Sequence, residues 1–234
     1  MASHHSAVAL KFCGLTRAED AVLAAALGAG FLGFIFAPSA RQLTVEGAAS
    51  LLRAVEDTPG SQRLPRPARV GVFAGMSADA IADTVDRLGL DVIQLHGGDD
   101  GELVPALRRR TRARIWMVLH VGESGIDGRQ LAAAAEGDGV LLDAKVDGML
   151  GGTGRSFDWA ATREVVEPLR DGRSIILAGG LRADNVARAI ALLAPDVVDV
   201  SSGVESAPGV KDPLRMRAFA DAVREARDRK PSHE

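Results

Sequence analysis

Residues 174–203, with the sequence SIILAGGLRADNVARAIALLAPDVVDVSSG, contain two short apolar runs on either side of a segment with helical spacing. Ser174–Ala178 and Val197–Ser201 are the expected strands, and Ala183–Leu193 is the expected helix. A helix between two short apolar strands is typical of a parallel pair, because parallel strands need a crossover and cannot be joined by a tight turn. The stretch therefore predicts a strand–helix–strand unit in a parallel sheet.

The same unit recurs along the chain and predicts a closed (β/α)8 barrel of the TIM type. Eight such units in 234 residues suit this α/β fold, which typically needs about 250. A doubly wound open sheet is the alternative, but the even repeats and the glycine-rich turns after the sixth and seventh strands favour the barrel. The expected strands are 8–13, 31–36, 68–73, 91–96, 114–120, 140–143, 174–178 and 197–201. The expected helices are 17–27, 45–55, 77–88, 101–110, 128–135, 159–169, 183–193 and 213–229.

Composition narrows the function classes. Apolar residues make up 47% of the chain, enough for a core, and the net charge of −3 lacks the basic excess of a nucleic-acid binder. No apolar run reaches the roughly 18 residues of a membrane span, and the N-terminus does not resemble a secretory signal. We therefore expect a cytoplasmic protein with no nucleic-acid or membrane partner. It should form one barrel domain over residues 1–234, with mobile termini at 1–7 and 227–234.

The chemistry of a parallel barrel lies at the carboxyl ends of its strands. Cys13, Asp143 and Arg41 all fall there. A thiol and a carboxylic acid form a plausible base and acid pair, although the thiol needs surroundings that favour the thiolate, because its ordinary pKa is about 8.5. Arginine binds planar carboxylates through two parallel hydrogen bonds. Each residue also has a plain structural interpretation, namely a small buried apolar group, a salt-bridge partner and a solvated loop charge.

Glycine and serine follow three neighbouring strands and predict an anion site. In barrels, phosphate commonly binds between the loops after strands seven and eight, where backbone N–H groups and helix N-termini point at the ligand. The alternative is that these glycines only turn the chain. We expect His96 and His120 to be structural, since no third metal ligand clusters with them. The candidate phosphate residues are Gly152, Thr153 and Gly154, then Gly179 and Gly180, and finally Ser201, Ser202 and Gly203.

Short motifs that span residues 11–212 occur in the same order as in one known family. The chain resembles phosphoribosylanthranilate isomerase, an enzyme of tryptophan biosynthesis. No single motif is decisive, but the ordered set is very specific. The motifs are 11–16 (KFCGLT), 33–36 with Ser39 and Arg41, 70–73, 94–97 and 141–144, followed by 151–154 with 157–159, 177–181 with Asn185 and Val186, and 199–205 running into 208–212.

The resemblance implies an Amadori rearrangement of N-(5-phospho-β-D-ribosyl)anthranilate to 1-(2-carboxyphenylamino)-1-deoxy-D-ribulose 5-phosphate. Asp143 would be the general acid and Cys13 the general base, while Arg41 would hold the anthranilate carboxylate and the glycine and serine loops the phosphate. The only implied partner is this phosphorylated small molecule, with no cofactor and no metal. The family contains monomers and homodimers, so the oligomeric state stays open.

Three other functions are weighed against this one. A related histidine-pathway barrel isomerase, or an enzyme that serves both pathways, would carry aspartate at the position of Cys13. Indole-glycerol-phosphate synthase uses lysines as acid and base, whereas here only Lys11 lies in an expected strand. A binding barrel without catalysis would not need Cys13, Asp143 and Arg41 together.

Overall fold

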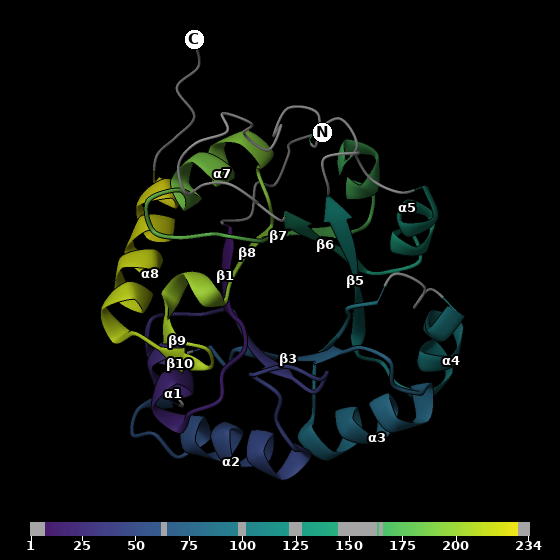
Figure 1. The fold of residues 1–234 in the computed structure, drawn as a ribbon, viewed down its shortest axis with the longest axis horizontal. Coiled ribbons are helices and arrows are strands. Elements are labelled where there is room, and N and C mark those ends of the chain that lie inside the picture. The colour runs from purple at the N-terminus through teal and green to yellow at the C-terminus, as the bar shows by residue number, and fades with distance from the viewer. Residues whose placement is uncertain are drawn as a thin grey trace.

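Eight parallel strands form a closed barrel with helices on its outside, as Figure 1 shows in a view down the barrel. This computed structural model describes residues 8–61, 65–97, 102–121, 128–144, 163 and 166–228. The predicted barrel is confirmed, and the open sheet is wrong because β1 pairs with β8 as well as with β2. The strands are β1 (Ala9–Phe12), β2 (Phe31–Ile35), β3 (Ala68–Phe73), β4 (Val92–Leu95), β5 (Arg114–Val121), β6 (Gly139–Ala144), β7 (Ser174–Ala178) and β8 (Val197–Val200).

The helices fall close to their predicted positions. Thr44 and Ser77 begin two of them by accepting hydrogen bonds from the backbone N–H groups of Gly47 and Ala80, as expected of N-terminal caps. The helices are α1 (Ala18–Ala26), α2 (Val45–Glu56), α3 (Ala78–Leu88), α4 (Leu103–Arg110), α5 (Gly128–Ala134), α7 (Val186–Leu193) and α8 (Pro213–Asp228), with the short 3-10 turns η3 (Glu167–Arg170) and η4 (Ser202–Val204).

Two of the predictions extend beyond the described ranges. Most of the helix expected over residues 159–169 lies outside them, and η3 occupies its end. Residues 1–7 and 229–234 also lie outside, whereas Arg227 and Asp228 of the expected mobile tail belong to α8. In the described part of the chain, no helix is long and apolar enough to cross a membrane.

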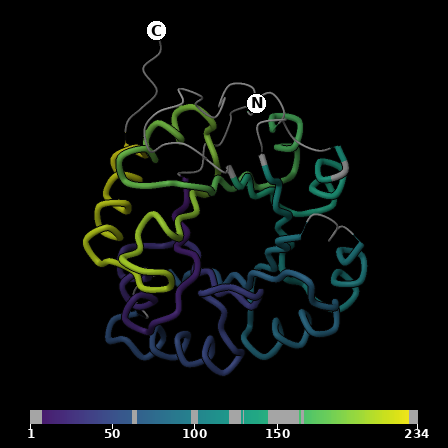
Figure 2. The backbone as a smooth tube through the Cα atoms, in the orientation of Figure 1, coloured from purple at the N-terminus to yellow at the C-terminus, as the bar shows by residue number. Residues whose placement is uncertain are grey.

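The ring closes where the first strand pairs with the last. Ala9 pairs with Val197 and Phe12 with Val200, so the purple β1 in Figure 2 lies beside the yellow-green β8. Successive side chains of a strand point to opposite faces, and two buried clusters result. Outward-facing residues such as Phe12 pack under the helices, against Phe219 of α8. Inward-facing residues fill the lower interior, and they are Val70, Val92, Trp116, Val118, Leu141, Ile176, Ala178 and Val197.

A small hairpin after β8 was not predicted. It consists of β9 (Glu205–Ala207) and β10 (Val210–Lys211), which pair antiparallel. Because it follows the carboxyl end of β8, it places Glu205 and Lys211 at the rim of the barrel where the predicted site lies.

Candidate active site

Cys13 directly follows β1 and lies buried at the carboxyl rim, with 6% of its surface exposed. The neighbouring strand makes room for it, because a Cβ atom at Gly33 would lie only 2.8 Å from Cys13 Sγ. Glycine in the middle of β2 is therefore explained by a close approach of the thiol. Lys11 is two residues earlier, so its side chain and that of Cys13 share the inner face of the barrel.

Lys11 forms a fully buried ion pair beneath the thiol. Its ammonium Nζ lies 2.6 Å from Asp199 Oδ2 on β8 and donates a second hydrogen bond of 2.8 Å to Gln94 Oε1 on β4. The lysine side chain is 0% exposed. The other carboxylate oxygen, Asp199 Oδ1, has no hydrogen-bond partner among the described residues. This layer of polar side chains separates the apolar lower interior from the rim.

The surroundings of Cys13 act on its pKa in opposite directions. Burial raises the pKa of the thiol, the charge of Lys11 lowers it, and the charge of Asp199 raises it again, so that the net pKa lies above its ordinary value. Burial also lowers the pKa of Lys11, but the charges of Asp199 and Cys13 together outweigh it and the net pKa is raised. Burial raises the pKa of Asp199. Burial therefore disfavours the charged form of both Lys11 and Asp199. We assign the ionised pair, because a contact of 2.6 Å favours opposite charges.

A second buried lysine, Lys211 of β10, fixes the backbone around the thiol. Its Nζ donates to the carbonyl oxygens of Cys13 at 2.6 Å and Ser201 at 3.2 Å, and to Glu205 Oε1 at 2.9 Å. Three N–H donors are thus used on three acceptors. Lys211 therefore ties the end of β1 to the end of β8 and to the hairpin.

Arg41 is bound by Glu205 through two parallel hydrogen bonds. Arg41 Nε donates to Oε1 at 2.7 Å, and Nη2 donates to Oε2 at 2.6 Å. Burial raises the pKa of Glu205, but the hydrogen bonds and charges of Arg41 and Lys211 outweigh it and lower the pKa to about 2. Glu205 takes two of the five N–H donors of the guanidinium, so the others stay available for a ligand. The Arg41 side chain lies beside Gly14, the residue after Cys13, since a Cβ atom at Gly14 would lie 2.6 Å from Arg41 Cδ.

Asp143 lies on the inner face of β6, in register with His120 on β5. Its Oδ2 atom is 3.8 Å from His120 Nδ1, and the carboxyl is 25% exposed at the barrel mouth. The His120 ring in turn meets His96 edge to face at 5.3 Å between centroids. Burial lowers the pKa of His96, so this imidazole is neutral near pH 7. The two histidines expected to be structural therefore lie beside the predicted acid.

The loops after β7 and β8 are in direct contact at the predicted phosphate site. A Cβ atom at Gly203 would lie 1.9 Å from the carbonyl oxygen of Leu181, so only glycine fits between them. Gly179 and Gly180 adopt positive φ angles of 87° and 60°, and Asn185 Nδ2 donates to the Gly180 carbonyl oxygen at 3.0 Å. The structure thus brings together all predicted phosphate residues except Gly152, Thr153 and Gly154, which lie outside the described residues.

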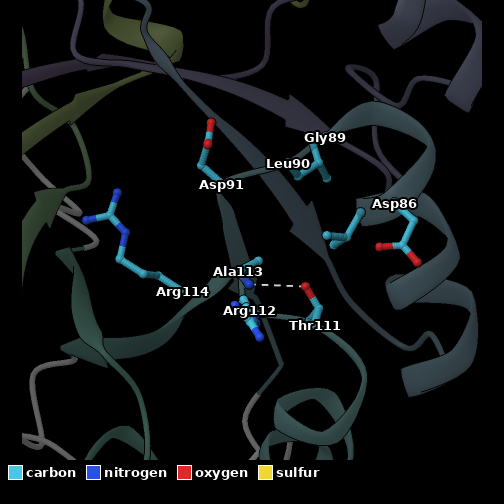
Figure 3. Close-up of a pocket in the computed structure, with 9 residues that line it drawn as sticks. Asp86, Gly89, Leu90, Asp91, Thr111, Arg112, Ala113 and Arg114 are labelled. Atoms are coloured by element: carbon cyan, nitrogen blue, oxygen red, sulfur yellow. Dashed lines mark hydrogen bonds between the residues drawn. The ribbon is translucent and has the colours of Figure 1, made fainter.

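A surface groove with two arginines lies at the opposite end of the strands (Figure 3). It is lined by the end of α3, by Asp91 just before β4, and by Thr111–Arg114 at the start of β5. Ala113 N donates to Thr111 Oγ1 at 3.1 Å and fixes the turn there. Because Cys13 and Asp143 lie at the carboxyl ends, this groove is separate from the candidate site.

Sequence reasoning gave no role to five buried polar residues around the thiol. Lys11, Gln94, Asp199, Glu205 and Lys211 are all buried, and every one of them lies within a motif of the resemblance. The signal was a charged residue among apolar neighbours in a short strand, as in VALKF and VVDV. Such a residue must find a partner inside the barrel, but the sequence does not say which one.

The fold and the rim residues define a (β/α)8-barrel enzyme. The family model described as N-(5'phosphoribosyl)anthranilate (PRA) isomerase matches residues 10–222. A curated relative of Pseudomonas aeruginosa, N-(5'-phosphoribosyl)anthranilate isomerase, is 40% identical over 223 residues, which cover 94% of this chain and 97% of the relative.

Two solved structures are similar over 93% of this chain and 99% of their own. One is of monomers generated from the dimeric phosphoribosylanthranilate isomerase of Thermotoga maritima, with 32% identity and a TM-score of 0.71. The other is a phosphoribosylanthranilate isomerase in complex with reduced 1-(o-carboxyphenylamino)-1-deoxyribulose 5-phosphate, with 31% identity and a TM-score of 0.72. This chain belongs to the N-(5'-phosphoribosyl)anthranilate isomerase family, and it is an isomerase of tryptophan biosynthesis.

Proposed function

We propose that Cys13 and Asp143 move the protons of the Amadori rearrangement. Asp143 protonates the furanose ring oxygen, the bond from C1 to that oxygen breaks, and the electron pair of the anthranilate nitrogen forms a Schiff base. Cys13 as thiolate then removes the proton from C2 and gives an enolamine, which takes up a proton at C1 while its C2 hydroxyl loses one, and becomes the ketosamine. A proton donor at the ring oxygen and a proton acceptor at C2 suit two groups on different strands.

The observation that carries this assignment is the position of both groups on the inner face at one rim. The charge of Lys11, which pairs with Asp199 at 2.6 Å, acts on the pKa of Cys13. The charge of Asp143 in turn acts on the pKa of Asp199. The thiol and the carboxyl are therefore connected electrostatically through one buried ion pair, although they come from β1 and β6.

The binding residues follow from the same geometry. Arg41, held by Glu205 next to the thiol, binds the anthranilate carboxylate through its remaining N–H groups. The loops around Gly180 and Gly203 bind the phosphate through backbone N–H groups. The relative solved with a reduced carboxyphenylamino deoxyribulose phosphate supports a ligand with a carboxylate at one end and a phosphate at the other. Binding energy at these two ends positions the carbons between them.

The decisive test compares Cys13→Ser and Asp143→Asn with the wild type. Turnover is followed through the loss of anthranilate fluorescence, and affinity for the reduced product analogue is measured by calorimetry. We expect turnover to fall by about two to four orders of magnitude while the analogue still binds. Near-wild-type turnover in either variant would remove that residue from the mechanism.

We propose also that the chain forms one barrel domain and works in the cytoplasm as a monomer or a homodimer. Membership of a biosynthetic enzyme family supports this location, and the dimeric Thermotoga relative supports the possibility of a dimer. Light scattering coupled to size exclusion distinguishes the two oligomeric states.

A further inference from the structure

The ammonium of Lys11 is held by two acceptors at the bottom of the candidate site. It donates to Asp199 Oδ2 at 2.6 Å and to Gln94 Oε1 at 2.8 Å. An ammonium has three N–H donors, so the third is left for Cys13, which lies two residues later on the same inner face and on whose pKa the charge of Lys11 acts. The side chain reaches across the barrel from β1 to β4 and β8, so its position is fixed from three sides.

We propose that Lys11, held in place by Asp199 and Gln94, is a positioning residue that stabilises the thiolate of Cys13. This inference rests on the proposed function, in which the thiolate is the base at C2. A thiol buried beside apolar neighbours stays protonated at neutral pH unless a cation or an N–H donor faces it. Lys11 supplies the cation and the N–H group that Asp199 and Gln94 do not use, since its ammonium is buried and its side chain shares the inner face with Cys13.

Four charged groups from four elements surround Cys13, and Lys11 has the largest charge effect on the pKa of its thiol. Lys211 of β10 uses its three donors on two backbone carbonyls and Glu205. Arg41, from the loop after β2, is bound by Glu205. Asp199 of β8 carries a negative charge, which opposes the thiolate and is balanced by its contact with Lys11. Burial leaves the pKa of the thiol raised, and Lys11 is the charge that lowers it most.

The test uses the fact that Cys13 is the sole cysteine of the chain. The rate of alkylation by iodoacetamide is followed by mass spectrometry from pH 6 to pH 10, and each profile is normalised to its own plateau at high pH. This normalisation separates thiolate formation from access to the buried sulfur. Absorbance at 240 nm, which reports the thiolate, gives a second profile.

We expect Lys11→Met to slow the normalised alkylation at pH 7 by about tenfold or more and to move the profile to higher pH. Lys11→Arg retains a cation and should lie between the wild type and Lys11→Met. Arg87→Met serves as a matched control, since it removes an exposed cation that pairs with Glu46 on the outer helices, and its profile should coincide with the wild type.

Lys11→Met leaves the buried Asp199 carboxylate without its partner, and this variant can fail to fold. A second variant avoids that problem. Lys11→Met with Asp199→Asn removes both charges, and its profile should still move to higher pH, since the N–H group left for Cys13 is lost. Profiles of the folded variants that coincide with the wild type would overturn the proposal. Turnover that survives in Cys13→Ser would instead overturn the proposed function and leave the titration result standing.

Discussion

Arg41 shows how one side chain at the rim is prepared for a ligand by a residue that does not bind it. Glu205 fixes the plane of the guanidinium through two hydrogen bonds, so little rotamer freedom remains to be lost on binding. The same carboxylate accepts from Lys211, which holds the Cys13 carbonyl oxygen. The base and the carboxylate-binding group are therefore parts of one network.

We predict that Arg41→Ala raises KM by about 10- to 100-fold, as expected for the loss of hydrogen bonds between charged groups, while kcat changes less. Arg41→Lys keeps the charge but lacks the planar fork, so its KM should also rise. Steady-state kinetics by anthranilate fluorescence measure both values. An unchanged KM in Arg41→Ala would show that this residue does not hold the carboxylate.

At the scale of elements, the contact between the loops after β7 and β8 sets the shape of the phosphate site. Gly203→Ala places a Cβ atom against the backbone oxygen of Leu181, which cannot rotate away. We expect KM to rise by about tenfold or more, because displacing binding groups by about 1 Å can cost that much. Calorimetry with the reduced product analogue checks the loss of affinity.

A glycine at the other end of the barrel is the control for this prediction. A Cβ atom at Gly30 would meet Ala9 Cβ at 3.5 Å, which is an ordinary contact. Gly30→Ala should therefore bind the analogue like the wild type. Equal affinities of Gly203→Ala and the wild type would contradict the predicted role of this loop.

The elements of the barrel could be predicted because their signals are local. Each strand is a short apolar run, and helices such as α3 begin with a capping side chain at Ser77. The hairpin of β9 and β10 has strands of three and two residues, too short to show any periodicity. The pairing of Lys11 with Asp199, 188 positions apart, depends on barrel closure and on the inner face of both strands, which no local pattern encodes.

The sequence predicted a role for some residues of the candidate site and not for others. Cys13 and Asp143 were found because strand ends in a barrel are where chemistry occurs. Glu205 and Lys211 were not found, because the hairpin that brings them to the rim was itself missed. The register between β5 and β6 brings His120 Nδ1 to 3.8 Å from the Asp143 carboxyl. The sequence does not encode that register, so it gives no sign that His120 lies beside the acid.

For the whole molecule, the network around Glu205 makes folding stability depend on pH. The folded pKa of Glu205 is about 2, against an ordinary value of 4.5. A lowered folded pKa stabilises the protein above the unfolded value, and this stability is lost as pH falls through the folded value. The shift corresponds to about 3 kcal/mol of unfolding free energy, present above about pH 4.5 and lost toward pH 2.

We predict that Glu205→Gln lowers the unfolding free energy at pH 7 by up to about 3 kcal/mol. The difference between the wild type and the variant should shrink as pH falls from about 4.5 to about 2, because protonation then neutralises Glu205 in the wild type too. Urea unfolding at a series of pH values measures this difference. A difference that stays constant over that range would show that Glu205 does not carry the effect.

The most direct test of the account is a crystal structure of this chain with the reduced product analogue bound. We predict that the phosphate lies on the loops around Gly180 and Gly203, and that Cys13 Sγ lies within about 3.5 Å of C2. Asp143 should face the oxygen that belonged to the furanose ring. A ligand bound at this rim with either the sulfur or the carboxyl turned away from those atoms would contradict the assignment of base and acid.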